Sequence, residues 1–235
     1  YNYLLLMVSK VPRHIAIILD GNRRYAKKLG LRLWKGNEFG LKRLEELLSW
    51  CIELGIEEVT LYCFSTENFK RSKKEIDYLF GLFWKEFEKV KKGEGVFKDR
   101  VKVNVIGRIN MFSKRMKGAM IEAMQKTEKN KALLVNFAMA YGGRQEIADA
   151  FKKIIKAKTK PNEINENLIT KNLYLKNEPD LVIRPGGETR TSNFLTWQSV
   201  YSEWVFVDKL WPEFTKEDLI KCIEEFNRRE RRFGE

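Results

Sequence analysis

Short apolar runs alternate with longer amphipathic stretches along nearly the whole chain of 235 residues. Such runs are typical of strands buried on both faces of a parallel sheet, and the stretches between them show the helical period. Strands are predicted at residues 15–19, 59–64, 101–106, 133–137, 180–183 and 204–207. Helices are predicted at residues 37–54, 72–92, 142–155 and 215–229 and in the stretch that ends near residue 128, with a polar loop at 156–167. The alternation predicts an α/β fold, a single mostly parallel sheet flanked by helices.

Ligands of such sheets bind beyond the carboxyl ends of the strands. This rule directs attention to the segments after Leu19, Phe64, Phe137 and Ile183. No repeat or linker interrupts the alternation, so residues 12–235 are predicted to form one domain after an N-terminal extension at residues 1–11. The apolar run at residues 3–8 is far shorter than the ~20 residues that span a bilayer, so any membrane contact is expected to be peripheral.

The chain is strongly basic, with 45 Lys and Arg against 32 Asp and Glu and a formal net charge of +13. A basic surface favours an anionic partner, such as a nucleic acid, an acidic membrane face or a phosphorylated small molecule. Charge alone does not choose among these partners, because Lys-rich helices are also ordinary solvated faces. The three cysteines are widely spaced, which argues against a disulfide framework or zinc site and fits a reducing cytosol. The single histidine excludes a multi-histidine metal site.

The segment DGNRRY follows the first predicted strand and comprises Asp20, Gly21, Asn22, Arg23, Arg24 and Tyr25. Free amides at the start of a helix and two arginines suit a phosphate group. Asp20 suits a Mg²⁺ ion that bridges phosphates, because this ion usually takes only one or two protein carboxylates. The alternative is a tight turn in which Asp20 caps the helix, and this segment alone leaves both interpretations open.

The segment FSTENFKR follows the second predicted strand, at residues 64–71. Its hydroxyl, amide and guanidinium groups stand beside two aromatic rings, which suits a ligand with a charged head and an apolar tail. A helix-capping loop with Ser65 or Thr66 as the cap explains the same residues, and the segment alone favours that explanation.

The segment RPGGETRTSN, at residues 184–193, follows the fifth predicted strand. Two glycines let backbone amides approach phosphate oxygens, and Arg184 and Arg190 supply guanidinium groups. A surface turn with unrelated arginines is the alternative, and the preceding strand end favours the phosphate site.

Three other features have a plain structural explanation. His14 is predicted to be a hydrogen-bonded structural residue. Glu203 lies among aromatic residues and is either a metal ligand or a paired core acid. The aromatic stripe in residues 72–92 packs in the core or lines a tunnel for a hydrocarbon chain; it consists of Phe80, Phe83, Trp84 and Phe87.

In this order, the segments resemble those of the cis-prenyltransferase family, which includes the undecaprenyl and dehydrodolichyl diphosphate synthases. The matching stretches are residues 14–28, 61–71, 180–194, 211–214 and 228–234. Arg23 and Tyr25 replace the glycine and tryptophan of the bacterial pattern and resemble the archaeal and eukaryotic branch. Asn37 replaces the usual histidine, and Leu33 stands where an arginine is usual.

The resemblance implies one catalytic domain with a hydrophobic tunnel. The implied reaction adds isopentenyl diphosphate repeatedly to an allylic primer, geranylgeranyl or farnesyl diphosphate, and gives a long polycis-polyprenyl diphosphate such as undecaprenyl diphosphate, a precursor of the glycosyl carrier lipid. Archaeal-like motifs favour geranylgeranyl diphosphate. Product length stays open, because it depends on the depth of the tunnel.

The resemblance also implies roles for particular residues. Asp20 and Glu203 would bind Mg²⁺, and Asn68 would assist proton removal. Substrate-binding roles are implied for Gly21, Asn22, Arg23, Arg24, Tyr25, Asn37, Ser65, Thr66, Glu67, Phe69, Arg71, Arg184, Arg190, Thr191 and Ser192. Arg232 and Gly234 resemble a motif that reaches a neighbouring subunit, which implies a homodimer. The implied location is cytoplasmic, with peripheral membrane contact for product release and no nucleic-acid partner.

Two alternatives stay open beside the enzyme. A basic nucleic-acid-binding protein would explain the charge, but the chain has no recognisable nucleic-acid-reading module. A non-catalytic partner subunit with the same fold could lack the metal carboxylate, whereas Asp20, Arg24 and Arg190 are all present. A trans-prenyl synthase is disfavoured because the chain has no Asp-Asp pair.

Overall fold

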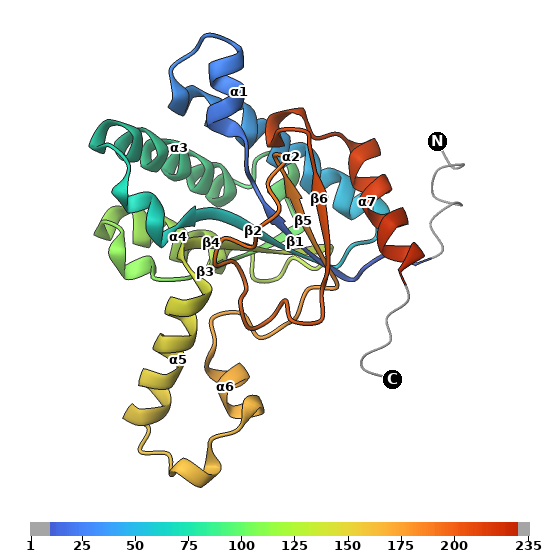
Figure 1. The fold of residues 1–235 in the computed structure, drawn as a ribbon. Helices are drawn as coiled ribbons and strands as arrows, with labels where there is room; N and C mark the ends of the chain where they lie inside the picture. Colours follow the sequence, from blue (N-terminus) through green and yellow to red (C-terminus); the bar gives the residue numbers. More distant parts are fainter. Residues whose placement is uncertain (1–9, 230–235) are drawn as a thin grey trace.

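Six parallel strands form one sheet at the centre of the structure, a computed structural model that describes residues 10–229 (Figure 1). The strands are β1 (His14–Ile18), β2 (Glu58–Ser65), β3 (Val101–Ile106), β4 (Leu133–Tyr141), β5 (Leu181–Pro185) and β6 (Glu203–Val207). Their order across the sheet is β3-β4-β2-β1-β5-β6, and every neighbouring pair is parallel. The predicted α/β fold and its six strands are therefore confirmed.

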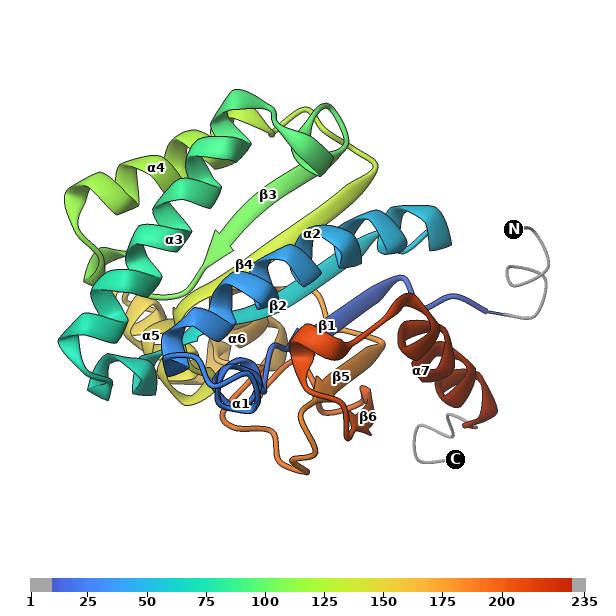
Figure 2. The ribbon, with the colours of Figure 1, turned by 90° about the horizontal axis from the view of Figure 1, so that it is seen from above.

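Helices cover both faces of the sheet (Figure 2). They are α1 (Asn22–Lys28), α2 (Gly36–Leu54), α3 (Lys73–Lys92), α4 (Lys114–Lys126), α5 (Gly143–Lys156), α6 (Glu166–Asn172) and α7 (Lys216–Arg228). Helices α2, α3, α4 and α7 share one hydrophobic core with the sheet. Helices α5 and α6 pack on each other and form a hairpin on the other side, which projects away from the sheet in Figure 1.

The side chains of β1 show why both faces must be covered. All five residues of this strand are buried, and successive side chains point to opposite faces. Ile15 and Ile17 pack in the core under α2, α3, α4 and α7. Ala16 and Ile18 pack in a second core with Phe194 and other residues of the chain after α6. A continuous apolar run therefore marks a central strand with no solvent face.

The prediction for the region after α5 was wrong in part. Helix α6 begins at Glu166, inside the segment predicted as a loop up to residue 167. Asn165 caps the helix, because its side chain accepts a hydrogen bond from the amide of Leu168. The helix has seven residues, which is too short to show a clear helical period in a polar sequence.

His14 is a buried structural residue, as predicted. Its Nε2 atom lies 2.8 Å from the hydroxyl of Thr60 on β2. Burial lowers the pKa of His14, and the nearby Glu58 carboxylate opposes this effect. The histidine therefore contributes a hydrogen bond between β1 and β2 at the amino end of the sheet.

The first helices pack unusually closely where β1 ends. Gly21 has a φ of 110°, which lets the chain turn from β1 into α1. Helix α2 crosses α1 at Gly40, where an added Cβ atom would lie 2.3 Å from Oδ1 of Asn22. The indole N–H of the fully buried Trp211 donates to the carbonyl of Gly40 at 3.0 Å, and its backbone amide donates to the carbonyl of Asp20 at 2.8 Å. These contacts fix the chain just beyond β1.

Two helical glycines give a matched test of this packing. Gly81 is exposed on α3, and an added Cβ atom there would meet nothing within 4 Å. Gly81→Ala should stabilise the protein by about 0.5–1 kcal/mol through the higher helix propensity of alanine. Gly40→Ala should destabilise it by about 1–3 kcal/mol, because Asn22 and Trp211 must shift. Urea unfolding measures both changes, and equal effects of the two substitutions would contradict the close packing.

Candidate active site

Two adjoining clefts open beyond the carboxyl ends of β1, β2 and β5, at the edge of the sheet that the sequence predicts. Their volumes are about 440 and 640 Å³. Both clefts are lined by Leu19, Asp20, Asn22, Asn37, Arg71 and Arg190. We refer to the two together as the polar cleft.

Asp20 lies at the centre of the polar cleft between two guanidinium groups. Its Oδ2 atom accepts a hydrogen bond from Nη2 of Arg184 at 2.8 Å, and its Oδ1 atom lies 3.2 Å from Nη2 of Arg24. The Arg184 side chain is only 4% exposed and also donates to the hydroxyl of Ser192 at 2.7 Å and to the carbonyl of Arg190. Asp20 does not cap α1, so the capping alternative is excluded for its side chain.

Glu75 is a buried residue that pairs with two further arginines of the polar cleft. Its buried carboxylate lies 3.2 Å from Nη1 of Arg71 and 3.7 Å from Nε of Arg23. Burial lowers the pKa of the Arg71 guanidinium, and the charge of Arg23 lowers it further, whereas Glu75 opposes both effects. The carboxylate therefore keeps two neighbouring cations in place.

Glu188 pairs with the remaining arginines at the mouth of the cleft. Its carboxylate contacts Nη1 of Arg190 and lies 3.8 Å from Nη1 of Arg24. The side chains of Arg24 and Arg190 are 45% and 60% exposed, so these ion pairs are weak in water. A diphosphate, with more charge and more acceptor atoms, can replace the carboxylate between them.

The loop after β2 forms the opposite wall of the polar cleft. Asn68 accepts a hydrogen bond from the amide of Ser65 at 3.0 Å, which supports the helix-capping interpretation of this loop. Glu67 accepts from the side chain of Asn193 at 3.3 Å, so it joins this loop to the chain after β5. Ser65, Glu67 and Asn68 all line the larger cleft as well, so capping and cleft lining occur in the same residues.

An apolar pocket lies beside the polar cleft between α2, α3 and the sheet. It is lined by Leu41, Leu44, Cys63, Phe83, Glu86, Phe87, Val90, Phe97, Phe137 and Met139. Cys63 also lines the polar cleft, and burial raises the pKa of its thiol to about 12, so the thiol is neutral. The pocket has a volume of about 40 Å³, which holds only a few carbon atoms. Phe83 and Phe87, which belong to the aromatic stripe predicted to line a tunnel, thus line this pocket. The pocket itself is too small to hold a long hydrocarbon chain.

The structure brings most of the predicted site residues together. Those that line the polar cleft are Asp20, Gly21, Asn22, Arg23, Arg24, Asn37, Ser65, Glu67, Asn68, Arg71, Arg184, Arg190 and Ser192. Tyr25, Thr66, Phe69 and Thr191 are absent from this lining; the ring of Tyr25 packs instead on Phe39, with centroids 5.2 Å apart. Arg232 and Gly234 lie outside the described residues.

Glu203 lies far from Asp20 within one chain. It is the first residue of β6 and lies level with Leu181 of β5 and Ile15 of β1. Asp20 follows the other end of β1, at least about 10 Å further along the sheet. The Glu203 carboxylate accepts a hydrogen bond from Arg229 at 2.9 Å, as a paired acid would. The two carboxylates therefore share no metal site in one chain.

Three charged residues of the site were not predicted. Glu75 and Glu188 act as counter-ions of the cleft arginines, and Lys27 lines the smaller cleft. Glu188 stands inside a segment that the sequence marked as a phosphate site, so its acidic side chain was a detectable signal. Glu75 gave no such signal, because an acidic residue in the first turn of a helix is common for other reasons.

Five arginines and one central carboxylate beside an apolar pocket define a site for a molecule with an anionic head and an apolar tail. The comparisons with known proteins agree. Residues 18–234 match a family model for prenyltransferases described as "Putative undecaprenyl diphosphate synthase". The chain belongs to this family, as its motifs indicate, and is an enzyme that transfers prenyl groups.

Relatives in sequence and structure support the assignment. The chain is 48% identical over 241 residues to the tritrans,polycis-undecaprenyl-diphosphate synthase (geranylgeranyl-diphosphate specific) of Thermococcus kodakarensis, covering 99% of this chain and 91% of that protein. The fold matches lavandulyl diphosphate synthase from Lavandula x intermedia in complex with dimethylallyl diphosphate, with a TM-score of 0.89, 32% identity, and 95% and 98% of the two chains covered. It also matches a probable undecaprenyl diphosphate synthase from Campylobacter jejuni, with a TM-score of 0.82, 35% identity, and 96% and 100% covered.

Glu75 is expected to act as a positioning residue. Glu75→Ala should lower kcat/KM for prenyl diphosphates about tenfold, mainly through KM, because Arg71 and Arg23 lose their shared partner. Glu75→Gln keeps an acceptor atom and should retain more activity. Asp77→Ala on the same helix removes an exposed ion pair with Lys73 and serves as the control. A Glu75→Ala enzyme with unchanged KM would contradict the positioning role.

Proposed function

We propose that the protein is a cis-polyprenyl diphosphate synthase that extends geranylgeranyl diphosphate with successive isopentenyl units. The observation that carries the proposal is the placement of Asp20 among arginines, in a cleft that shares Cys63 with an apolar pocket. The relative from Thermococcus kodakarensis is named as geranylgeranyl-diphosphate specific, which supports this primer. The product is proposed to be a long polycis-polyprenyl diphosphate such as undecaprenyl diphosphate.

The two diphosphates are proposed to bind on two sides of Asp20. Arg23, Arg24 and Arg71, with Gly21 and Asn22, line the smaller cleft and would hold the diphosphate of the allylic primer. Arg190 and Ser192 line the larger cleft and would hold isopentenyl diphosphate. Arg184 is already bonded to Asp20 and Ser192, so it would orient these two groups as well as contact the substrate.

A magnesium ion fits this arrangement. Mg²⁺ keeps several waters and is usually bound by one or two carboxylates together with substrate phosphates. Asp20 supplies one carboxylate that is 28% exposed and faces the polar cleft. Within residues 10–229, no three His, Cys, Asp or Glu side chains gather as a metal site, so substrate oxygens would complete the coordination. When bound, the ion would neutralise charge on the departing diphosphate.

The reaction forms a bond between the allylic carbon and the terminal carbon of the isopentenyl group. The allylic C–O bond breaks, the diphosphate leaves with the electron pair, and the isopentenyl group loses a proton. Arginines fixed in advance around the leaving group stabilise this charge without reorganising during the reaction. Asn68, which lines the larger cleft, is proposed to orient the groups at which the proton is lost. A long product would need more room than the about 40 Å³ of the apolar pocket.

A homodimer in the cytoplasm with peripheral membrane contact is proposed for the assembly. Strand β6 is at the edge of the sheet and exposes Phe206, and the preceding loop exposes Val200. An exposed strand edge with apolar side chains supports self-association at this edge. Among the helices of residues 10–229, none combines the length and the apolar character required to cross a bilayer.

The primer proposal is tested by elongation with labelled isopentenyl diphosphate and Mg²⁺, started from geranylgeranyl or farnesyl diphosphate. Geranylgeranyl diphosphate should give the higher kcat/KM, and chromatography of the products should show long chains from it. Incorporation that stops after one addition from either primer would contradict a polymerising enzyme. Preference for farnesyl diphosphate would contradict only the assignment of the primer.

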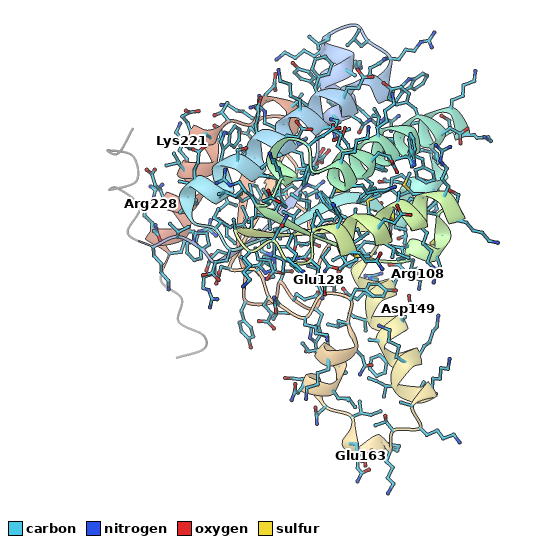
Figure 3. All side chains as sticks on the ribbon, turned by 180° about the vertical axis from the view of Figure 1, so that it is seen from behind. Arg108, Glu128, Asp149, Glu163, Lys221 and Arg228 are labelled. Carbon is cyan, nitrogen blue, oxygen red and sulfur yellow. The ribbon has the colours of Figure 1, made fainter. Side chains whose placement is uncertain are left out.

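Asp20 is tested by comparison with an aspartate of similar burial outside the polar cleft. Asp20→Ala should reduce kcat about a thousandfold, because it removes the metal carboxylate and the partner of Arg184. Asp149 is 20% exposed and bonded to Arg108 at the start of the α5–α6 hairpin (Figure 3). Asp149→Ala should lower stability but leave kcat within a fewfold of the original value. Near-normal turnover by Asp20→Ala would refute its role.

A further inference from the structure

Exposed apolar side chains are concentrated between α1 and the first turn of α2. Leu29, Leu31, Leu33 and Phe39 are 46%, 42%, 37% and 38% exposed. They are four of the ten large apolar side chains that are exposed within residues 10–229, yet they fall within one short stretch of the chain. We call these four residues the leucine rim. Clustered exposed apolar groups mark an interaction surface, whereas single ones need no explanation.

The leucine rim lies in the most basic part of the chain. Residues 21–39, which include the whole rim, contain six Lys and Arg residues and one acidic residue, Glu38. Lys35 pairs with Glu38 within this stretch and Lys28 pairs with Glu213 from elsewhere in the chain, whereas Arg32 stacks on the ring of Trp34 at 5.7 Å. Apolar tips between cations, with an aromatic ring beside them, are complementary to an anionic membrane face.

The position of the leucine rim links it to the polar cleft. Figure 1 shows α1 and the chain after it projecting from the body, at the end opposite to the α5–α6 hairpin. Leu33 belongs to the rim and also lines the smaller cleft, together with Lys27. A surface that touches the leucine rim would therefore lie against the mouth of the polar cleft.

We propose that the leucine rim docks the protein on an anionic lipid bilayer. Leucine side chains would enter the interface between headgroups and acyl chains, and the surrounding cations would contact lipid phosphates. The proposed function explains only why docking would be useful, since a long polyprenyl product is itself a lipid. The docking itself is inferred from the surface of the protein. A protein partner is a weaker fit, because protein interfaces have few charges at their centre and mixed charges around it.

The test measures binding of the full chain to vesicles by flotation, without substrate. Vesicles of phosphatidylcholine alone are compared with vesicles that also contain phosphatidylglycerol, at about 0.15 M and about 1 M salt. The original protein should bind the anionic vesicles, and high salt should weaken this binding. Leu29→Ser with Leu31→Ser should weaken it about tenfold or more, because the variant loses two inserted apolar side chains.

Ile155→Ser is the matched control. Ile155 is 71% exposed on α5, at the other end of the molecule, and several lysines surround it in the sequence. This control should bind vesicles as the original protein does. Thermal unfolding and prenyl transfer in detergent should be unchanged in both variants, which shows that Leu29 and Leu31 act outside the chemistry.

Four outcomes would overturn the proposal. The first is that the original protein does not bind vesicles, and the second is that the Leu29 and Leu31 variant binds as well as the original protein. The third is that Ile155→Ser weakens binding as much as the leucine variant does, and the fourth is that the leucine variant changes its oligomeric state. Equal binding by the leucine variant would assign the contact to another part of the chain, such as the apolar run at residues 3–8. Because the binding assay contains no substrate, failure of the proposed reaction would leave its result intact.

Discussion

The ion pair between Asp20 and Arg184 is the interaction on which the rest of the site depends. Arg184 belongs to β5 and is almost completely buried, so its charge needs a partner at close range. Asp20 provides that partner from the end of the neighbouring strand β1. The same contact fixes the carboxylate in the polar cleft and, through Ser192 and the carbonyl of Arg190, fixes the chain after β5. One buried charge thus joins the two sides of the site.

The other arginines are held by carboxylates of different exposure, and this difference separates two kinds of contact. Glu75 is buried, and removal of its charge would leave Arg71 and Arg23 close together without compensation. Glu188 is partly exposed and pairs with arginines that water also reaches. An arriving diphosphate can therefore replace Glu188 at low cost, whereas Glu75 stays in place beneath it. Each of the five cleft arginines therefore has an acidic partner before a ligand arrives, namely Asp20, Glu75 or Glu188.

Much of this arrangement is predictable because parallel sheets leave a strong pattern in the sequence. Continuous apolar runs give the strands, and the rule that ligands bind at their carboxyl ends brings Asp20, Arg71 and Arg190 together. Glu203 shows where the rule and the resemblance disagree. The resemblance implied a metal-binding role, whereas the strand predicted at residues 204–207 already placed Glu203 at the amino end of a parallel strand, away from Asp20. The pairing of Glu75 with two arginines depends on how α3 packs, which no local pattern reveals, and a short polar helix such as α6 lacks a periodic signal.

The close packing of α1 and α2 connects the leucine rim to the chemistry. An added Cβ atom at Gly36 would lie 1.8 Å from the carbonyl oxygen of Asn22, so the two helices approach as closely as backbones allow. This approach places Asn22 and Asn37 in the polar cleft. The connection between the two helices carries Leu29 and Leu31, which stay exposed. The proposed docking on a membrane would move these side chains from water into an apolar interface, next to the helix that lines the cleft.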